Sequence, residues 1–496
     1  MTEISVRLSD LLEERGMDQK ALKDLDIAGL TADSRAVKPG YLFAALPGAQ
    51  ADGRAFIGEA VARGASAILA PPGTDLGPAT VGDAGPVRLI TDSNPRRRFS
   101  LMAARYFGAQ PDTVVAVTGT NGKTSVAHFT QQLWSALGRK AGYLGTLGAW
   151  APGVHVDGSL TTPDPVRLHS LLADMAKHGT THLAMEASSH GLHQFRMDGV
   201  KVSVAAFTNL TRDHLDYHGS IAAYLAAKLR LFSDLMISGG VAVLNADASE
   251  FHAFEAAAKL RGHTIMSFGR NGAAIQLTDH TVDGDAQRIT FLVFGKKYTV
   301  RLPLAGAFQV SNALCALGCV LGSDAEPDRA IAALENLRGV PGRMEQAGRH
   351  ASGAPVYVDY AHTPDALETV LSNLRPHVGS GGRLIVVFGC GGDRDKGKRR
   401  LMGERAQSLA DVVYVTDDNP RTEAAADIRA QVMQGCLTAT EIGDRADAIA
   451  TATASLKSGD VLLIAGKGHE SGQIVGTSVL PFNDVDVVRA ALGART

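Results

Sequence analysis

Short apolar runs alternate with polar, glycine-rich segments along the first part of this chain. The segments YLFAALPG, SAILAPPG and VRLITD have the length and the turn residues of strands that end in loops, and residues 56–62 have apolar positions at helical spacing. This pattern predicts a small α/β domain over residues 1–93. An arginine-rich stretch with helical spacing, residues 94–107, predicts a helix that connects this domain to the next one.

Strand and helix patterns also alternate over the rest of the chain. Residues 114–117 form a β-branched run, and helical spacing follows a glycine-containing loop. The runs THLAME, VSVAAFTNL and GVAVLNAD continue the alternation, and VYVDYAH, LIVVFGCGG, VVYVTDD and VLLIAGKG repeat it in the last third. Strands that alternate with helices predict parallel sheets. The expected fold class is therefore α/β, with domains over residues 1–93, 94–342 and 343–496, and segment 151–159 is expected to be a surface loop.

The segment VTGTNGKTS, residues 117–125, carries the clearest chemistry. Gly119 and Gly122 would let the backbone approach a polyanion closely, and the amides that start the following helix would point at it. Lys123 would reach the terminal phosphates of a nucleotide, and Thr124 would offer its hydroxyl to Mg²⁺. The spacing departs from the general G-x-x-x-x-G-K-[ST] pattern, because a valine stands at the first glycine position. The segment predicts a phosphate site, against the alternative of an ordinary strand–helix turn.

Lys228 lies in a helical pattern, SIAAYLAAKLRLFSDLM, on one face with four apolar residues: Ile221, Leu225, Phe232 and Leu235. Two interpretations of this spacing stay open. A lysine on an apolar stripe commonly extends its ammonium to the rim. A buried lysine instead has a lowered pKa and a neutral amine, which can add CO₂ and become a metal-binding carbamate.

Polar residues at other strand ends are candidates for a metal site and a ligand site. Glu186 ends THLAME and His214 lies in TNLTRDHLDYHG; Mg²⁺ prefers oxygen ligands, and either residue could be structural instead. In the last third, residues 389–400, 416–423 and 466–470 each follow an apolar run. Their arginines can bind a carboxylate through two parallel hydrogen bonds. These segments predict one shared ligand site, against solvated basic loops as the alternative.

Composition narrows the class of protein. The chain has 496 residues, of which 45% are apolar and 20% charged, and a net charge of −2, which favours neither nucleic acid nor an anionic membrane as a partner. We see no apolar stretch long enough for a membrane span, and the N-terminal residues are too charged for a signal peptide. We therefore expect a cytoplasmic protein. As a separate expectation, its partners are small molecules and it is a monomer. Its four cysteines are expected to be buried thiols: Cys315, Cys319, Cys390 and Cys436.

Several motifs, taken in order, resemble those of the Mur ligase family over essentially the whole chain: TGTNGKTS, the Glu186 strand end, TNLTRDHLDYHGS, YAHTPDAL, GCGGDRDKGKR, DNPR and GKGHE. This family builds the peptide stem of bacterial peptidoglycan. The resemblance implies a small N-terminal α/β domain for a UDP-sugar, a central P-loop-type ATPase with a parallel sheet, and a C-terminal Rossmann-like domain that binds an amino acid. It also implies ATP as co-substrate and Mg²⁺ as cofactor.

The resemblance assigns candidate residues to each ligand. ATP would be bound by Gly119, Thr120, Asn121, Gly122, Lys123, Thr124, Ser125, Asn312 and Arg343. The UDP-sugar-peptide would be bound by Ser34, Gln50, Ala51, Thr161, Thr162, Ser188, Gln194 and Arg196, and Leu160 replaces an asparagine found in some relatives. Mg²⁺ would be bound by Thr124, Glu186, His214 and a carbamylated Lys228. The catalytic residues would be Lys123, Lys228, His214 and Glu186.

The late motifs imply which amine is added. In similar ligases, DNPR accompanies meso-diaminopimelate, whereas lysine-adding relatives lack the arginine. Diaminopimelate carries a second carboxylate that arginines can bind, and lysine would leave those arginines unpaired, which can reject it by roughly 10⁴-fold. The residues implied are Arg394, Asp418, Asn419, Pro420, Arg421, Gly466 and Glu470.

The expected reaction joins this amine to the γ-carboxylate of D-glutamate in UDP-N-acetylmuramoyl-L-alanyl-D-glutamate, after ATP has converted the carboxylate to an acyl phosphate. The base that deprotonates the amine is not identified, with His214 and His362 as candidates. Four alternatives stay open: a lysine-adding muramyl ligase, a folylpolyglutamate synthase-like ligase, a P-loop kinase or NTPase that uses Lys123 and Thr124, and a non-enzymatic nucleotide-binding module.

Overall fold

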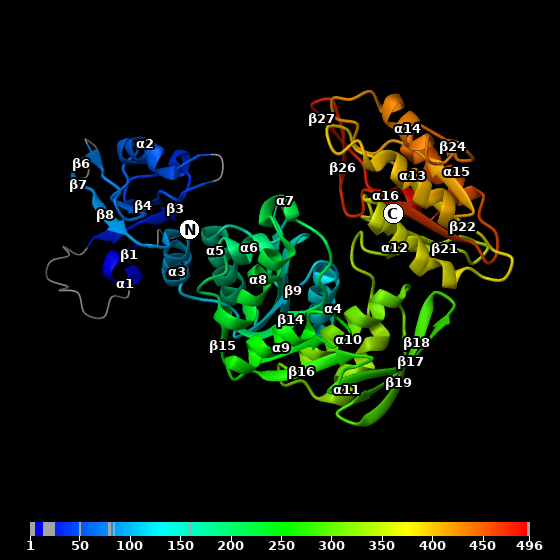
Figure 1. The fold of residues 1–496 in the computed structure, drawn as a ribbon, viewed down its shortest axis with the longest axis horizontal. Coiled ribbons are helices and arrows are strands. Elements are labelled where there is room, and N and C mark those ends of the chain that lie inside the picture. The colour runs from blue at the N-terminus through cyan, green and yellow to red at the C-terminus, as the bar shows by residue number, and fades with distance from the viewer. Residues whose placement is uncertain are drawn as a thin grey trace. The chain divides into compact units, whose positions relative to one another are not determined.

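The computed structural model describes residues 5–12, 25–48, 51–77, 81–82, 85–158 and 160–493 (Figure 1). The chain forms two compact units, which we describe separately: Met1–Ser267 with Cys319–Asp324, and Phe268–Gly318 with Ala325–Thr496. Within the described residues, no helix combines the length and the apolar character that a membrane crossing requires. The domain boundaries expected after residues 93 and 342 remain predictions.

The N-terminal part of the first unit is a small α/β sheet. Its elements are β1 (Val6–Arg7), α1 (Leu8–Leu12), β2 (Asp26–Ile27), β3 (Gly29–Thr31), β4 (Tyr41–Ala44), α2 (Ile57–Ala62), β5 (Ala67–Ala70), β6 (Val81–Gly82), β7 (Gly85–Pro86), β8 (Arg88–Thr91) and α3 (Pro95–Phe107). The main sheet is parallel, in the order β3-β4-β5-β8. The Asn94 side chain caps the start of α3, and Gly108 ends it with a φ of 70°. The predicted connecting helix is thus confirmed.

The central part of the same unit is built on a larger sheet. Its elements are β9 (Thr113–Thr118), α4 (Lys123–Ala136), β10 (Ala141–Gly145), β11 (Gly148–Ala151), β12 (Val154–Val156), α5 (Pro165–Lys177), β13 (His182–Glu186), α6 (Ser189–His193), β14 (Val202–Phe207), α7 (Leu215–His218), α8 (Ile221–Arg230), the π-helical turn η4 (Leu231–Leu235), β15 (Met236–Asn245), α9 (Phe251–Leu260) and β16 (Thr264–Gly269). Their strand order is β12-β11-β10-β13-β9-β14-β15-β16.

Helices cover both faces of this sheet around the parallel strands β10, β13, β9, β14 and β15 (Figure 1). Val114 and Ala116 of β9 pack in one core with side chains of α5 and α9, and α4 packs on the sheet outside that core. The surface loop expected over residues 151–159 was wrong in part. Residues Val154–Val156 form the edge strand β12, and Val154 and Val156 pack against the core. Ser159 lies outside the described residues.

The second unit contains three neighbouring antiparallel strands, two helices, and a separate, mostly parallel sheet with its own helices. Its elements are β17 (Ile275–Asp283), β18 (Ala286–Val293), β19 (Lys296–Leu302), α10 (Ala307–Leu321), α11 (Pro327–Ala333), β20 (Glu345–Arg349), β21 (Pro355–Asp359), α12 (Pro364–Leu374), β22 (Leu384–Phe388), α13 (Lys398–Leu409), β23 (Val412–Val415), α14 (Ala425–Met433), β24 (Thr440–Glu441), α15 (Arg445–Ala454), β25 (Val461–Ala465), β26 (Gly472–Val475), β27 (Ser478–Pro481) and α16 (Asp484–Ala491).

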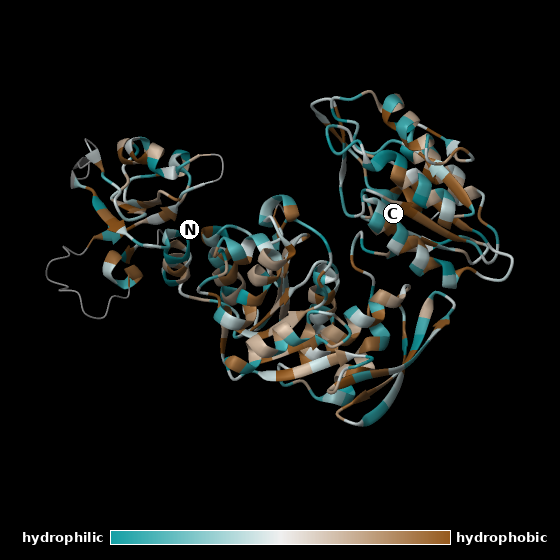
Figure 2. Cartoon of the chain, in the orientation of Figure 1, coloured by the Kyte–Doolittle hydropathy of each residue, from teal (hydrophilic) through white to brown (hydrophobic). Residues whose placement is uncertain are grey.

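The C-terminal sheet has the order β20-β21-β25-β22-β23-β24, and all its strands except β20 are parallel. One core joins it to α12, α13 and α14, and a second core joins its other face to α15 and α16. Strands covered on both faces are almost continuously apolar, as Figure 2 shows. These layers confirm the α/β fold class and the Rossmann-like C-terminal part. All four cysteines are buried, as predicted.

Candidate active site

The predicted phosphate loop leaves β9 and leads directly into α4. Gly119 has a φ of 148°, and an added Cβ would lie 1.9 Å from the Thr208 hydroxyl oxygen, so only glycine fits there. Gly122, with a φ of 84°, immediately precedes α4. The Thr120 amide donates to the carbonyl of Asn209, which follows the neighbouring strand β14 (2.8 Å). The loop is therefore held in a fixed shape at the carboxyl edge of the sheet, with the helix N-terminus beside it.

Two lysines donate to the same carbonyl oxygen of this loop. Lys123 Nζ lies 2.9 Å from the Gly119 oxygen, and Lys228 Nζ lies 2.7 Å from it. Lys228 is 1% exposed, and its Nζ is 4.3 Å from the centre of the Tyr224 ring. Burial, and then the nearby charge of Lys123, hold the pKa of Lys228 well below its ordinary value. The interpretation that Lys228 extends its ammonium to the solvent-exposed rim was therefore wrong.

The buried face of the helix that carries Lys228 is not the face that the sequence predicted. Ile221 at its start is 42% exposed, whereas Tyr224 and Ala227 are buried. After Arg230 the chain continues as the π-helical turn η4, which adds a residue to the turn and keeps Phe232 in the core. The amine of Lys228 is therefore buried by Tyr224 and the phosphate loop more than by the stripe that the spacing indicated.

Glu186 lies at the end of β13, next to β9, and is fully buried. The Tyr143 hydroxyl (2.6 Å) and the Thr146 amide (2.8 Å) donate to its Oε1. The hydroxyls of Thr124 (3.0 Å) and Thr146 (3.2 Å) donate to its Oε2. Two predicted metal ligands, Thr124 and Glu186, are thus in contact. Tyr143 and Thr146 could not be recognised from local sequence patterns, because these do not show that β10 lies beside β13.

His214 lies at the surface, immediately before α7, with a left-handed backbone (φ 52°). Its side chain is 46% exposed, and its Nε2 is 3.5 Å from a carboxylate oxygen of Asp213. Its ring and that of Tyr224 have centroids 6.2 Å apart. Tyr224, which the sequence did not single out, therefore contacts both His214 and Lys228. Within the described part of the chain, His, Cys, Asp and Glu side chains do not form any group of three or more that could hold a metal ion.

The residues predicted for the sugar-peptide in the central part form one connected cluster beside Glu186. The Thr162 hydroxyl donates to the Glu186 carbonyl (3.1 Å) and accepts from the Ser188 amide and hydroxyl (3.0 Å each). Arg196 donates to the Thr162 carbonyl (2.8 Å) and to the Gln194 side chain (2.7 Å). The hydroxyl of Thr161 lies 3.0 Å from that of Thr146. Leu160, at the departure from the family pattern, is exposed.

The N-terminal candidates lie in segments that follow strands β3 and β4 of the small parallel sheet. Ser34 is buried, and its hydroxyl donates to Oε2 of Glu59 on α2 (2.7 Å). Ala51 accepts a hydrogen bond from the Gly48 amide (3.0 Å). Gln50 lies outside the described residues.

In the second unit, hydrogen bonds join two loops of the predicted amino-acid site, residues 389–397 and 416–423. They follow the adjacent strands β22 and β23. The Asp393 carboxylate accepts from the Thr422 hydroxyl (2.7 Å), and the Asp393 amide donates to Glu423 (2.6 Å). The Arg421 guanidinium donates to the Gly392 carbonyl (2.8 Å), while Arg394 is exposed at the tip. The buried side chain of Arg399 donates to both oxygens of Glu423 (2.9 and 3.0 Å).

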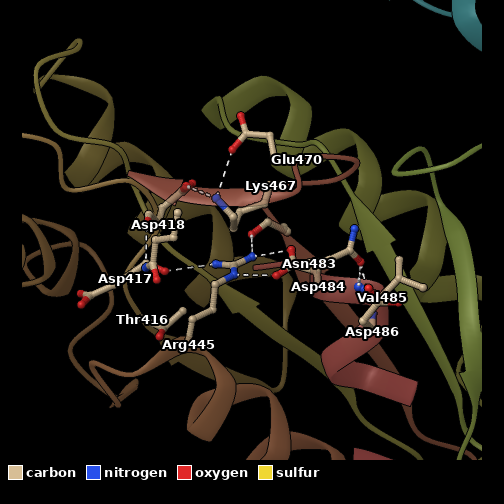
Figure 3. A network of polar contacts seen from close by, with 12 residues as sticks. Thr416, Asp417, Asp418, Arg445, Lys467, Glu470, Asn483, Asp484, Val485 and Asp486 are labelled. Carbon is tan, nitrogen blue, oxygen red and sulfur yellow. Dashed lines mark hydrogen bonds and ion pairs between the residues drawn. The ribbon is translucent and has the colours of Figure 1, made fainter. Parts of the chain in front are cut away.

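The loop after β25 brings further predicted residues to the same edge. Gly466 has a φ of 119°, and a Cβ there would lie 2.9 Å from a carboxylate oxygen of Asp418. The Asn419 side-chain amide donates to Glu470 (2.9 Å). Figure 3 shows an ammonium between Asp418 and Glu470, that of Lys467, which sequence analysis did not select.

Beneath these loops lies a fully buried ion pair (Figure 3). Arg445 donates to both oxygens of Asp484 (2.7 and 2.8 Å) and to the Ala465 carbonyl at the end of β25 (3.1 Å). The pair therefore ties the start of α16 to the strand ends that carry the site. The other two predicted ATP residues also belong to this unit: Asn312 is buried on α10, and the Arg343 guanidinium lies over the Tyr360 ring (4.8 Å).

Three family models match successive parts of the chain. They are described as "Mur ligase family, catalytic domain" over residues 26–99, "Mur ligase middle domain" over residues 117–320, and "Mur ligase, glutamate ligase domain" over residues 342–468. The phosphate loop, Glu186, His214 and Lys228 lie within the second match, and Arg394 and the DNPR segment within the third.

The chain is also similar to curated proteins along its length. A UDP-N-acetylmuramoyl-L-alanyl-D-glutamate–2,6-diaminopimelate ligase of Bradyrhizobium diazoefficiens is 51% identical, over 99% of this chain and 100% of the relative. One of Rhizobium meliloti is 53% identical over 95% of both chains. A solved structure with the same enzyme name has a TM-score of 0.74 and 34% identity, and the match covers 99% of both chains. The chain described here belongs to the Mur ligase family.

Proposed function

We propose that this protein is an ATP-dependent, ADP-forming ligase that adds meso-2,6-diaminopimelate to UDP-N-acetylmuramoyl-L-alanyl-D-glutamate in peptidoglycan precursor synthesis. Full-length relatives at 51% and 53% identity carry that name. One observation within the chain carries the choice of amine. The DNPR segment, residues 418–421, is hydrogen-bonded to the loop that bears Arg394, so two arginines stand on fastened neighbouring loops. That arrangement suits a substrate with an additional carboxylate.

ATP is proposed to bind with its phosphates on Gly119–Ser125, with Lys123 facing the terminal phosphate. Its ammonium donates to the carbonyl oxygens of Gly119 (2.9 Å) and Thr120 (2.8 Å), and a phosphate oxygen is a stronger acceptor for an ammonium than a backbone carbonyl. Asn312 and Arg343 are proposed for the remaining part of the nucleotide. These assignments rest on the loop geometry and on the family.

The donor atoms around Thr124 and Glu186 fit Mg²⁺, because a hydroxyl and a carboxylate meet there at 3.0 Å and oxygen ligands are preferred. His214 and a carbamylated Lys228 are proposed to complete the ligand set. A bound divalent cation would offset the charge of the phosphates and of the acceptor carboxylate. Within the protein, Tyr143 and Thr146 hold the Glu186 carboxylate in one orientation.

Carbamylation of Lys228 is supported by burial and by charge. Its Nζ and that of Lys123 share one acceptor, so two ammonium groups would lie within about 6 Å of each other. A neutral amine removes that repulsion. Its nitrogen lone pair can then form a bond to the carbon of CO₂, and loss of one N–H proton to solvent leaves a carbamate anion.

The acceptor is proposed to lie against Thr161, Thr162, Ser188, Gln194 and Arg196. This places its D-glutamate carboxylate near Glu186 and the phosphate loop, since Thr162 bonds directly to the Glu186 carbonyl. The carboxylate would take the γ-phosphoryl group of ATP and become an acyl phosphate. Attack by the amine of diaminopimelate then forms the amide and releases phosphate. Holding the reactants in line would supply most of the rate.

We further propose that Ser34, Gln50 and Ala51 contact the UDP part, and that the three domains are residues 1–93, 94–342 and 343–496. A monomer in the cytoplasm is proposed, where ATP and nucleotide-linked precursors occur.

The test is ADP release by the purified full chain with ATP, Mg²⁺ and a matrix of acceptors and amines. The proposal predicts turnover only when the UDP-muramyl dipeptide and diaminopimelate are both present. Turnover with lysine in place of diaminopimelate would indicate a lysine-adding ligase, and turnover with a folate and glutamate would indicate a folylpolyglutamate synthase. ADP release without any amine would indicate a kinase or NTPase.

A further inference from the structure

Lys467 is a fully buried lysine at the carboxyl end of β25. Its side chain is 0% exposed, yet it sits among the residues proposed to bind the amino acid (Figure 3). Its Nζ lies 3.1 Å from Asn419 Oδ1, 3.1 Å from Glu470 Oε2 and 3.8 Å from Asp418 Oδ1. A buried ammonium is retained only where such acceptors compensate its desolvation. The charge of Lys467 is therefore expected to act on the three residues that surround its ammonium.

The first consequence concerns the Asn419 side chain. Its Oδ1 accepts from two groups that can only donate, the Lys467 ammonium (3.1 Å) and the Ile474 amide (2.9 Å). Its Nδ2 must therefore face the other way, where it donates to Glu470. A flipped amide would place an NH₂ group against two donors. Asn419 thus presents a donor, which suits a carboxylate of the ligand, and not the acceptor that an ammonium would require.

The second consequence concerns charge. Asp418 and Glu470 are two carboxylates that face one lysine, so the group carries one net negative charge. The neighbouring Arg445–Asp484 pair is neutral as a whole and does not alter that balance. Glu470 is the open member, at 34% exposed, against 8% for Asp418. One uncompensated negative charge at the open side suits one ammonium of a ligand.

We propose that Lys467 is a positioning residue for amino-acid specificity. It sets the direction of the Asn419 amide and neutralises one of two carboxylates, so the site offers one donor for a carboxylate beside one acceptor for an ammonium. An amino-acid centre carries both groups on one carbon, and the distal end of lysine carries only the ammonium. The inference rests on the proposed function, because it names what one end of the diaminopimelate site recognises.

The experiment is a double-mutant cycle with Lys467→Met and Asn419→Ala in the full chain. The readouts are kcat/KM for diaminopimelate, for lysine and for ATP. Lys467→Met is expected to lower kcat/KM for diaminopimelate by about 10- to 100-fold, the range for a hydrogen bond to a charged group, and to change that for ATP by less than about threefold. The ratio of diaminopimelate to lysine use should fall. Losses from the two substitutions should not multiply, because Lys467 acts through Asn419.

Lys457→Met is the matched control, since Lys457 is an exposed lysine that precedes β25 at the opposite end of that strand. It should match wild type. If Lys467→Met does not fold, as judged by its melting transition, the cycle is repeated with Lys467→Gln, which keeps a donor and removes the charge. Multiplicative losses, or equal losses for ATP and diaminopimelate, overturn the inference. A wild-type enzyme that does not use diaminopimelate instead overturns the proposed function.

Discussion

Replacing Lys228 with methionine removes a buried amine and keeps a side chain of similar length. The Gly119 oxygen retains its bond from Lys123 at 2.9 Å, so no acceptor is left unpaired. The unfolding free energy should therefore change by less than about 2 kcal/mol in either direction. Activity should fall far more, by about 10²- to 10³-fold, the loss typical of removing one group that stabilises charge in the transition state.

Two measurements separate these effects. ADP release at saturating substrates gives the activity, and thermal unfolding gives the stability. Lys259→Met on α9 is the control, because the Lys259 ammonium is exposed and pairs with Glu255 in the same helix (2.7 Å), an arrangement that contributes little. Its activity and stability should match those of wild type.

A smaller substitution tests the carbamate itself. Lys228→Ala should lose most activity and regain part of it with bicarbonate or short carboxylates, which can enter the space left by the side chain and restore a negative charge. Full activity in Lys228→Met would exclude a catalytic role for the Lys228 amine. So would a loss of activity that simply follows the fraction of unfolded protein.

Three further predictions concern other residues. Arg421→Ala should raise KM for diaminopimelate at least tenfold and leave KM for ATP nearly unchanged; equal increases would contradict its role. Tyr143→Phe removes one of four donors to Glu186 and should lower kcat roughly tenfold without preventing folding, as steady-state kinetics and circular dichroism can check. Burial lowers the pKa of His128 to about 3, so its contribution to stability is present above pH 6.5 and is lost as the pH falls towards 3. Urea unfolding of wild type should lose roughly 2 kcal/mol more between pH 7 and pH 5 than that of His128→Phe, and parallel losses would contradict this pKa.

Local sequence patterns were sufficient to predict many of the helices and strands and the position of the phosphate loop. A short apolar run that ends at a glycine-containing loop and is followed by helical spacing is typical of a strand, a loop and a helix. The structure has these three elements around Gly119, as predicted. Lys228 was predicted less well. The spacing indicated its apolar surroundings, but Ile221 is exposed and a π-helical turn follows the helix, which a regular period of 3.6 residues does not describe.

Residues that depend on strand order could not be found from one sequence. Tyr143 reaches Glu186 because β10 lies beside β13, forty-three positions away in the chain. Lys467 reaches Asn419 because two strand ends meet at one edge of the C-terminal sheet. The pairing of strands is a long-range property, and hydropathy periodicity describes only neighbours along the chain.

An isotope measurement can establish whether ATP activates the acceptor carboxylate before the amine attacks it. The acceptor is prepared with ¹⁸O in its D-glutamate γ-carboxylate and incubated with the full chain, ATP, Mg²⁺ and diaminopimelate. One ¹⁸O atom is expected in each inorganic phosphate released, because the bond broken by the amine joins carbon to the oxygen shared with phosphorus. Unlabelled phosphate formed together with the amide product would contradict the claim.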